Sequence, residues 1–201
     1  FIDPAGGAEA NRWQGTLAET VISAEAPPTA ALLEKTLRLI ETRGSLLAAG
    51  LPRQMLRPVV LIIDELAELG AASEPKEAEQ CRRHLRRVLA LGRKANVAVV
   101  LATQRTTATS IDVTTRALAA NRLALAHPGD TYGSEALLGP GRREAASLRK
   151  TDTGAGYLTD GGPPQLIRIY EAPEPAVSVG EVASLDDVRR WDLAALRELT
   201  A

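Results

Sequence analysis

The sequence predicts an α/β layered fold with a mainly parallel sheet. Residues 59–63 (VVLII) and 97–102 (VAVVLA) contain no polar residue, which is typical of parallel strands covered on both faces. Between them, residues 76–94 have the apolar periodicity of an amphipathic helix. Strand, helix and strand at this spacing predict a βαβ unit with a right-handed crossover.

The remaining elements are predicted in chain order. Residues 1–3 indicate the end of a strand before the turn at 4–7, and residues 20–23 a short strand. Leu33, Leu37 and Ile40 share one face of a helix over 29–49, which follows two prolines and ends at Gly50. After the βαβ unit we expect a helix over 111–120, a strand over 122–126, a helix over 131–138, strands over 155–158 and 166–170, a linker at Pro173 and Pro175, and a closing helix over 181–199.

Composition narrows the function classes. The 201 residues suit one domain with a substantial core, or one domain with an appendage. The net charge of −1 and the 3% aromatic content exclude bulk attraction to nucleic acid and stacking on aromatic side chains as main devices. A single cysteine excludes an internal disulfide, and no apolar run is long enough to span a membrane. Because the chain begins at Phe1 and not at Met, we expect an incomplete segment whose upstream part holds some of the function.

The strongest chemical motif is VVLIIDEL, residues 59–66. A rigid apolar strand would hold Asp64 at the sheet edge, where an aspartate can bind Mg²⁺, usually through a water, while the metal bridges the β- and γ-phosphates of a nucleotide. Glu65 could then accept a proton from the attacking water or orient it. The alternative is a strand that merely ends in acidic turn residues, and this motif alone leaves both interpretations open.

A second polar group follows the next strand, in LATQR, residues 101–105. Gln104 can hydrogen-bond to a γ-phosphate or to the attacking water and so report the state of the nucleotide. Ligands of parallel α/β sheets bind just past the carboxyl ends of the strands. The residues expected at that position are Asp64, Glu65, Gln104 and Arg105. LATQR alone could be a polar loop start, but its pairing with Asp64 and Glu65 across one βαβ unit favours a site.

A basic stretch over 82–94 contains no acidic residue. Its side chains could act as arginine fingers towards a neighbouring subunit's ATP, or contact a phosphate backbone. For most of them the better interpretation is a solvated helix face, partly neutralised by Glu77 and Glu79. Arg93 is the exception, because it lies at the helix end, where the chain turns towards the sheet. The basic residues are Arg82, Arg83, Arg86, Arg87, Arg93 and Lys94.

The chain has no G-x-x-x-x-G-K-[ST] phosphate-binding loop. Gly6-Gly7 and Gly139-Pro140-Gly141 both lack the lysine and the hydroxyl that would hold phosphates. We therefore expect these residues alone not to hydrolyse ATP.

Taken together, the motifs resemble the FtsK/SpoIIIE family of DNA translocases. They occur in the family's order, at about its spacing, and cover most of residues 1–160. The matching stretches are FIDPAGGAE (1–9), LIIDELAEL (62–69), LGRKANVAVVLATQR (91–105), ALAANRLAL (117–125) and EALLGPG (135–141).

The resemblance implies a RecA-like P-loop NTPase fold in which the Walker A strand and loop lie upstream of the DPxGG turn and are absent from these residues. It implies a hexameric ring that hydrolyses ATP with Mg²⁺ and pulls double-stranded DNA through its pore. Asp64 and Glu65 match the Walker B pair, and Gln104 matches the sensor glutamine. Arg93 matches an arginine that acts across the subunit interface, and Arg105 a pore-loop contact to DNA.

Departures from the family pattern point to one branch. Ala5 replaces the lysine of DPKG, and TQRP is TQRT here. Ala119 stands where a lysine is common, and Arg116, one helical turn earlier, is the candidate substitute for DNA contact. Residues 153–201 match chromosome-partitioning members poorly, so the chain looks more like a plasmid-transfer member. Two alternatives stay open: a type VII secretion-like ATPase that moves proteins, and a degenerate assembly module that does not hydrolyse ATP.

We therefore predict that residues 1–172 are the C-terminal part of a motor domain and 173–201 a linker and closing helix. The implied cofactors are ATP and Mg²⁺. The implied partners are double-stranded DNA, further copies of the chain in a ring, and an upstream half with the P-loop. The expected location is cytoplasmic, and a membrane tether in an upstream segment is left open. Conjugation and chromosome segregation during cell division are the expected processes.

Overall fold

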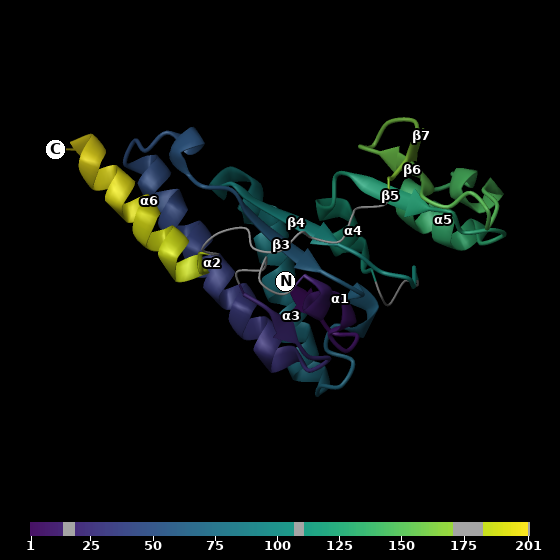
Figure 1. Ribbon diagram of the computed structural model, residues 1–201, viewed down its shortest axis with the longest axis horizontal. Coiled ribbons are helices and arrows are strands. Elements are labelled where there is room, and N and C mark those ends of the chain that lie inside the picture. The colour runs from purple at the N-terminus through teal and green to yellow at the C-terminus, as the bar shows by residue number, and fades with distance from the viewer. Residues whose placement is uncertain (14–18, 107–110, 171–182, 201) are drawn as a thin grey trace. The chain divides into compact units, whose positions relative to one another are not determined.

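A computed structural model describes residues 1–13, 19–106, 111–170 and 183–200 (Figure 1). By their contacts they form two units: the first combines the described residues up to 103 with 183–200, and the second comprises those from 104 to 170. The predicted motor-domain boundary at residue 172 stays a prediction. The predicted linker at Pro173 and Pro175 lies outside the described residues.

The first unit is built on a parallel sheet, as the sequence predicts. The strand order is β2–β1–β3–β4, with all neighbours parallel. In the central pair, Val59 lies opposite Val97 and Ile63 opposite Leu101. The strands are β1 (Ile2–Asp3), β2 (Val21–Ile22), β3 (Val59–Ile63) and β4 (Val97–Leu101). The helices are α1 (Ala8–Arg12), α2 (Ala26–Ala48), α3 (Pro75–Gly92) and α6 (Leu185–Thr200).

Two helices of the first unit have proline in their first turn. α2 begins at Ala26, three residues earlier than the sequence predicts, with Pro27 and Pro28 in its first turn. Proline suits the first helical positions because the N–H it lacks has no partner there and its φ is already helical. α3 likewise begins at Pro75. The closing helix begins at Leu185, whereas the sequence predicts a start at 181, and the described residues 183 and 184 before it are not helical.

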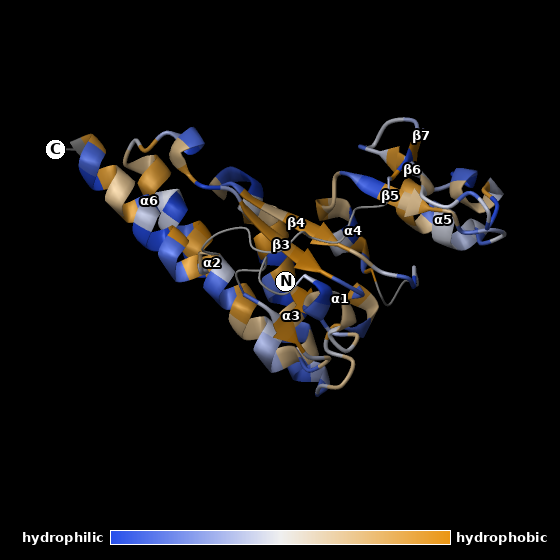
Figure 2. Cartoon of the chain, viewed as in Figure 1, coloured by the Kyte–Doolittle hydropathy of each residue, from blue (hydrophilic) through white to orange (hydrophobic). Residues whose placement is uncertain are grey.

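Only one face of the sheet is covered by the described residues, whereas the sequence predicts that both faces are covered. Leu61, Ile63 and Val97 are buried, and α3 packs on β4 and on α2. On the other face, however, Val60 is 55% exposed and Val100 is 49% exposed. Both strands are hydrophobic along their length (Figure 2). Sequence hydropathy shows that both faces are suited to burial but not whether anything covers them, and the described residues cover only one.

The helix α6 closes the first unit by packing along α2 (Figure 1). Ala195 and Leu196 pack against a cluster of Leu46, Leu51 and Leu56. Beside this cluster, a completely buried ion pair joins the two helices, from Arg43 Nε to Asp192 Oδ2 at 2.7 Å. Because α6 contributes to the core, it belongs structurally to the first unit.

The second unit is a small antiparallel sheet with short helices. The strand order is β5–β6–β7, with both neighbouring pairs antiparallel, and β6 and β7 form a hairpin. Ala124, Leu138 and Ala145 form its core. The strands are β5 (Arg122–Leu125), β6 (Ala155–Thr159) and β7 (Gln165–Arg168), and the helices are α4 (Val113–Leu118) and α5 (Thr131–Leu138).

Asn96 fixes the turn into β4, and its replacement gives a stability prediction. Its backbone is left-handed (φ 55°), Nδ2 donates to Leu56 O at 2.7 Å, and Oδ1 accepts from Arg53 at 3.2 Å. Asn96→Ala loses these bonds and puts alanine, which lacks the short polar side chain that lets asparagine tolerate the left-handed region, where the backbone costs it about 1–2 kcal/mol. We therefore expect a total loss of about 2–3 kcal/mol. Asn96→Gly tolerates the backbone and should lose less. Urea unfolding measures both, and equal losses would contradict this explanation.

Candidate functional site

Two turns meet at the carboxyl edge of the first unit's sheet. Asp64 N donates to Ile2 O at 2.9 Å, so the end of β3 lies beside the end of β1. The buried carboxylate of Asp3 accepts from Ala5 N at 3.0 Å and from Ala10 N at 3.3 Å, which shapes the turn that follows β1. The structure therefore places the 4–7 turn and the Asp64–Glu65 pair at one sheet edge.

Glu65 has an unusual backbone. Its φ of 48° and ψ of 68° are left-handed, and Asn96 is the only other non-glycine residue with a positive φ in the described part of the chain. A left-handed non-glycine residue is strained, and such strain concentrates at functional sites. Glu65 Oε1 accepts from Thr103 Oγ1 at 2.6 Å and from Ala67 N at 3.3 Å. The carboxylate is thus held in a defined direction at the mouth of β3 and β4.

The residues present are compatible with Mg²⁺ and a nucleotide phosphate. Asp64 is half-buried directly after β3. Mg²⁺ keeps several waters and takes one or two carboxylates together with substrate phosphates, so a single aspartate at the strand end suits it. In the described ranges, no group of three or more His, Cys, Asp or Glu side chains could form a protein cage for a metal. Asp64 would hold the ion mainly through water, and the ion would neutralise phosphate charge there.

Gln104 and Arg105 follow Thr103 directly, but by their contacts they belong to the second unit. Both side chains are exposed. Their predicted roles, as the sensor and as a DNA contact, stay predictions.

Arg93 lies at the opposite edge of the sheet from Asp64 and Glu65. It follows α3 and precedes the amino end of β4, whereas the acidic pair follows the carboxyl end of β3. Five residues of strand separate the two edges, which is about 16 Å at about 3.3 Å per residue. The exposed side chain of Arg93 is therefore far from the acidic pair of the same chain. A role of Arg93 in hydrolysis would require it to reach the nucleotide of a neighbouring copy.

The rest of the basic stretch is largely a solvated face, as expected. Arg82 and Arg86 both pair with Glu79 on α3. Arg87 pairs with Glu41 of α2 at 3.3 Å. These arginines have carboxylate partners within their own unit, so they need no external phosphate.

Arg116, the candidate DNA contact in α4, is half-buried in the second unit. Its Nη1 donates to Ala136 O of α5 at 3.2 Å. One donor of the guanidinium thus ties α4 to α5, which gives Arg116 a structural task besides the predicted one.

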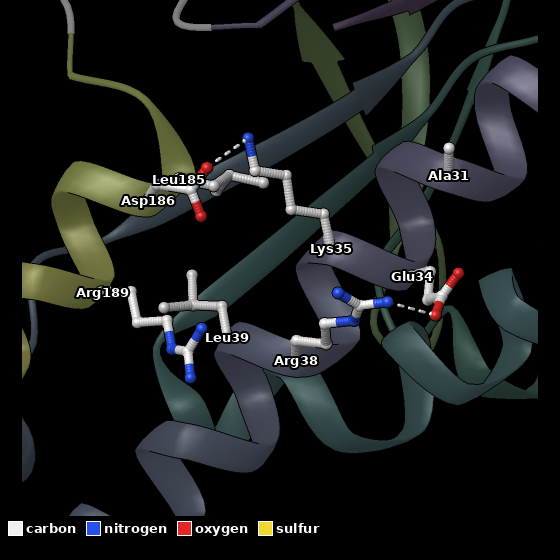
Figure 3. Close-up of a pocket in the computed structure, with 8 residues that line it drawn as sticks. All are labelled: Ala31, Glu34, Lys35, Arg38, Leu39, Leu185, Asp186 and Arg189. Atoms are coloured by element: carbon white, nitrogen blue, oxygen red, sulfur yellow. Dashed lines mark hydrogen bonds and ion pairs between the residues drawn. The ribbon is translucent and has the colours of Figure 1, made fainter.

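A pocket of about 340 Å³ lies away from the predicted site, between α2 and α6 (Figure 3). Lys35 projects into it and pairs with Glu19 and with Asp186, both at 2.9 Å. None of the predicted site residues lines it. The Lys35 ammonium in this pocket is already neutralised by two carboxylates.

Sequence reasoning missed Thr103, which contacts Glu65. The motif LATQR contains it, but only the pairing of β3 with β4 brings its hydroxyl to Glu65. Cys81, by contrast, is a core residue: burial raises the pKa of its thiol to about 11, so the thiol stays protonated. None of the helices in the described ranges combines the length and hydrophobicity needed to cross a bilayer.

Comparisons with known proteins find likeness in structure but not in sequence. No family model and no curated protein matches the chain. The conjugation coupling protein TcpA of pCW3, solved as a monomer with ATPγS, matches with a TM-score of 0.71 at 17% identity, over 83% of this chain and 50% of that one. The cytoplasmic domain of the Thermomonospora curvata type VII secretion ATPase EccC matches with a TM-score of 0.63 at 21% identity, over 99% and 24%.

A second structure of EccC from the same organism, its ATPases 2 and 3 with a signal sequence peptide, matches with a TM-score of 0.54 at 19% identity, over 98% of this chain and 36% of that one. At these identities the likeness shows the fold alone. The predicted α/β fold with a parallel sheet is confirmed, and the chain shares this fold with the solved ATPase structures. The chain spans half the length of TcpA and less of EccC.

Proposed function

We propose that this chain is part of a ring-shaped motor that uses ATP to move double-stranded DNA, in plasmid transfer or chromosome segregation. The observation that carries the proposal is the Asp64–Glu65 pair at the carboxyl edge of a parallel sheet, with Glu65 held in a strained, oriented conformation. The fold shared with a coupling protein solved with ATPγS supports nucleotide binding. In this proposal Asp64 holds Mg²⁺ through water, and Glu65 takes the proton of the attacking water.

The phosphate-binding half of the site would be supplied by a segment outside these 201 residues. Val60 and Val100 leave one sheet face exposed, and β4 pairs with a strand on one side only among the described residues. An apolar face of a parallel sheet is normally covered, and an unpaired strand edge normally has a partner or a cover. A strand, P-loop and helix added beside β4 would satisfy both needs. These residues alone would then not hydrolyse ATP.

The remaining residues act on the nucleotide or on DNA in this proposal. Gln104 would sense the γ-phosphate, and Arg93 would reach the nucleotide of a neighbouring copy from its own sheet edge. Arg105, with Arg116 in support, would contact DNA phosphates. Phosphate contacts position a protein on DNA without reading its sequence, which suits a motor that moves along any sequence.

Protein secretion is the second candidate function, because two EccC structures share the fold. The two functions differ in what stimulates hydrolysis. With the full-length protein, we expect double-stranded DNA to raise ATP turnover and a signal-sequence peptide to leave it unchanged. ATP turnover that is stimulated by the peptide and not by DNA would favour secretion and would contradict the DNA proposal.

Arg105 gives a test of the DNA contact. Arg105→Ala should weaken DNA binding of the full-length protein to a similar extent on all sequences, and should reduce the slope of log K against log salt by about 1. Arg87→Ala is the matched control, because Arg87 is an exposed arginine already paired with Glu41. A salt titration of binding measures both. An unchanged slope for Arg105→Ala would remove this residue from the DNA contact.

A further inference from the structure

An extra residue interrupts the ladder between β3 and β4 at the acidic pair. Ala102 N donates to Ile63 O at 2.9 Å, and Ala102 O accepts from Leu66 N at 2.7 Å. In a regular parallel ladder, a residue bonds the two residues on either side of one opposite partner. Here two residues, Asp64 and Glu65, lie between Ile63 and Leu66, where a regular ladder has one. The end of the strand therefore contains a β-bulge. Bulges change the direction of side chains and are common beside active sites.

Glu65, the second residue of the bulge, has the left-handed backbone, and its carboxylate lies at the hydroxyl of Thr103. Thr103 follows Ala102, the residue that the bulge brackets. The 2.6 Å bond from Thr103 Oγ1 to Glu65 Oε1 has the length expected of a hydroxyl that donates to a charged carboxylate. A threonine hydroxyl has one proton to donate, so the bond commits the hydroxyl to this carboxylate and opposes rotation of the Glu65 side chain.

We propose that Thr103 is a positioning residue for Glu65. Its hydroxyl fixes the direction of the carboxylate that takes the proton of the attacking water. This inference rests on the proposed function, since it assumes that Glu65 activates water. Thr103 itself is not required to touch the nucleotide. Its loss should therefore lower kcat and leave the KM for ATP nearly unchanged, because misdirection of a catalytic group affects the transition state more than substrate binding.

The experiment compares ATP turnover by the full-length protein and its variants. Thr103→Val, which keeps the shape and removes the hydroxyl, should lower kcat about tenfold to a hundredfold. Thr103→Ser, which keeps the hydroxyl, should retain most of the wild-type turnover. Thr42→Val is the matched control, because the Thr42 hydroxyl donates to Arg38 O within α2. A Thr103→Val protein with the wild-type kcat, or one whose loss appears only in KM, would overturn the inference.

Two further measurements separate this inference from the proposed function. If Glu65→Gln leaves turnover at the wild-type level, the proposed function fails, whatever Thr103 does. If Glu65→Gln abolishes turnover while Thr103→Val does not lower it, only the positioning role fails. A double-mutant cycle on urea unfolding with Thr103→Val and Glu65→Ala tests the contact without any activity. We expect non-additive shifts of the midpoint, and strictly additive shifts would overturn the inference even if all variants fold.

Discussion

Replacing Asp192 with alanine is expected to lower the free energy of unfolding by about 3–5 kcal/mol, because it leaves a buried arginine without its counter-ion. Arg43 and Asp192 are 0% and 2% exposed, and the two side chains meet at 2.7 Å. The guanidinium also donates to Ala95 O at 2.8 Å and to Arg57 O at 2.7 Å. It therefore joins α6 to the loops that lead into β3 and β4.

Asp186→Ala is the matched control for this prediction. Asp186 also lies on α6 and pairs with an α2 cation, Lys35, but its side chain is 64% exposed. Solvent-exposed pairs contribute little to stability, so the control should lose much less than Asp192→Ala. Urea unfolding of the 201-residue chain, followed by circular dichroism, measures both. Equal losses for the two variants would contradict the assignment of α6 to the core of the first unit.

Much of the fold could be predicted because local patterns determine it. Residues 59–63 and 97–101 are strands because their apolar runs suit a buried sheet, and α5 has the predicted bounds, 131–138. The covering of the sheet could not be predicted, since the exposure of Val60 depends on what packs there and not on its own hydropathy. The role of α6 was also hidden, because Arg43 and Asp192 are 149 residues apart.

The candidate site could be predicted in part. Asp64 and Glu65 stand out because acidic residues directly follow an apolar strand, and the structure places them at the expected sheet edge. The left-handed backbone of Glu65 has no signal in the sequence, because glycine or asparagine is the usual residue there. Thr103 was hidden because its contact depends on the register of two strands and on a bulge.

Glu65→Gln is expected to reduce ATP turnover of the full-length protein by about 10²–10⁴-fold, the range that general base catalysis contributes. Glutamine keeps the size of the side chain and can still accept the hydrogen bond from Thr103, but it cannot take a proton from water. The loss should appear in kcat, and the affinity for ATPγS should stay close to that of the wild type, because in the proposed mechanism the carboxylate acts in the transition state. Asp64 should hold the metal ion in both proteins.

Glu77→Gln is the matched control, since Glu77 is an exposed glutamate in the first turn of α3. The central claim is that Asp64 and Glu65 form the metal-holding and water-activating half of a motor ATPase site. Its most direct test is the steady-state rate of ATP hydrolysis, with saturating double-stranded DNA, of the full-length wild-type, Glu65→Gln and Glu77→Gln proteins. We predict turnover for the wild type and for Glu77→Gln, and a loss of at least about a hundredfold for Glu65→Gln. Equal turnover by all three would contradict the claim.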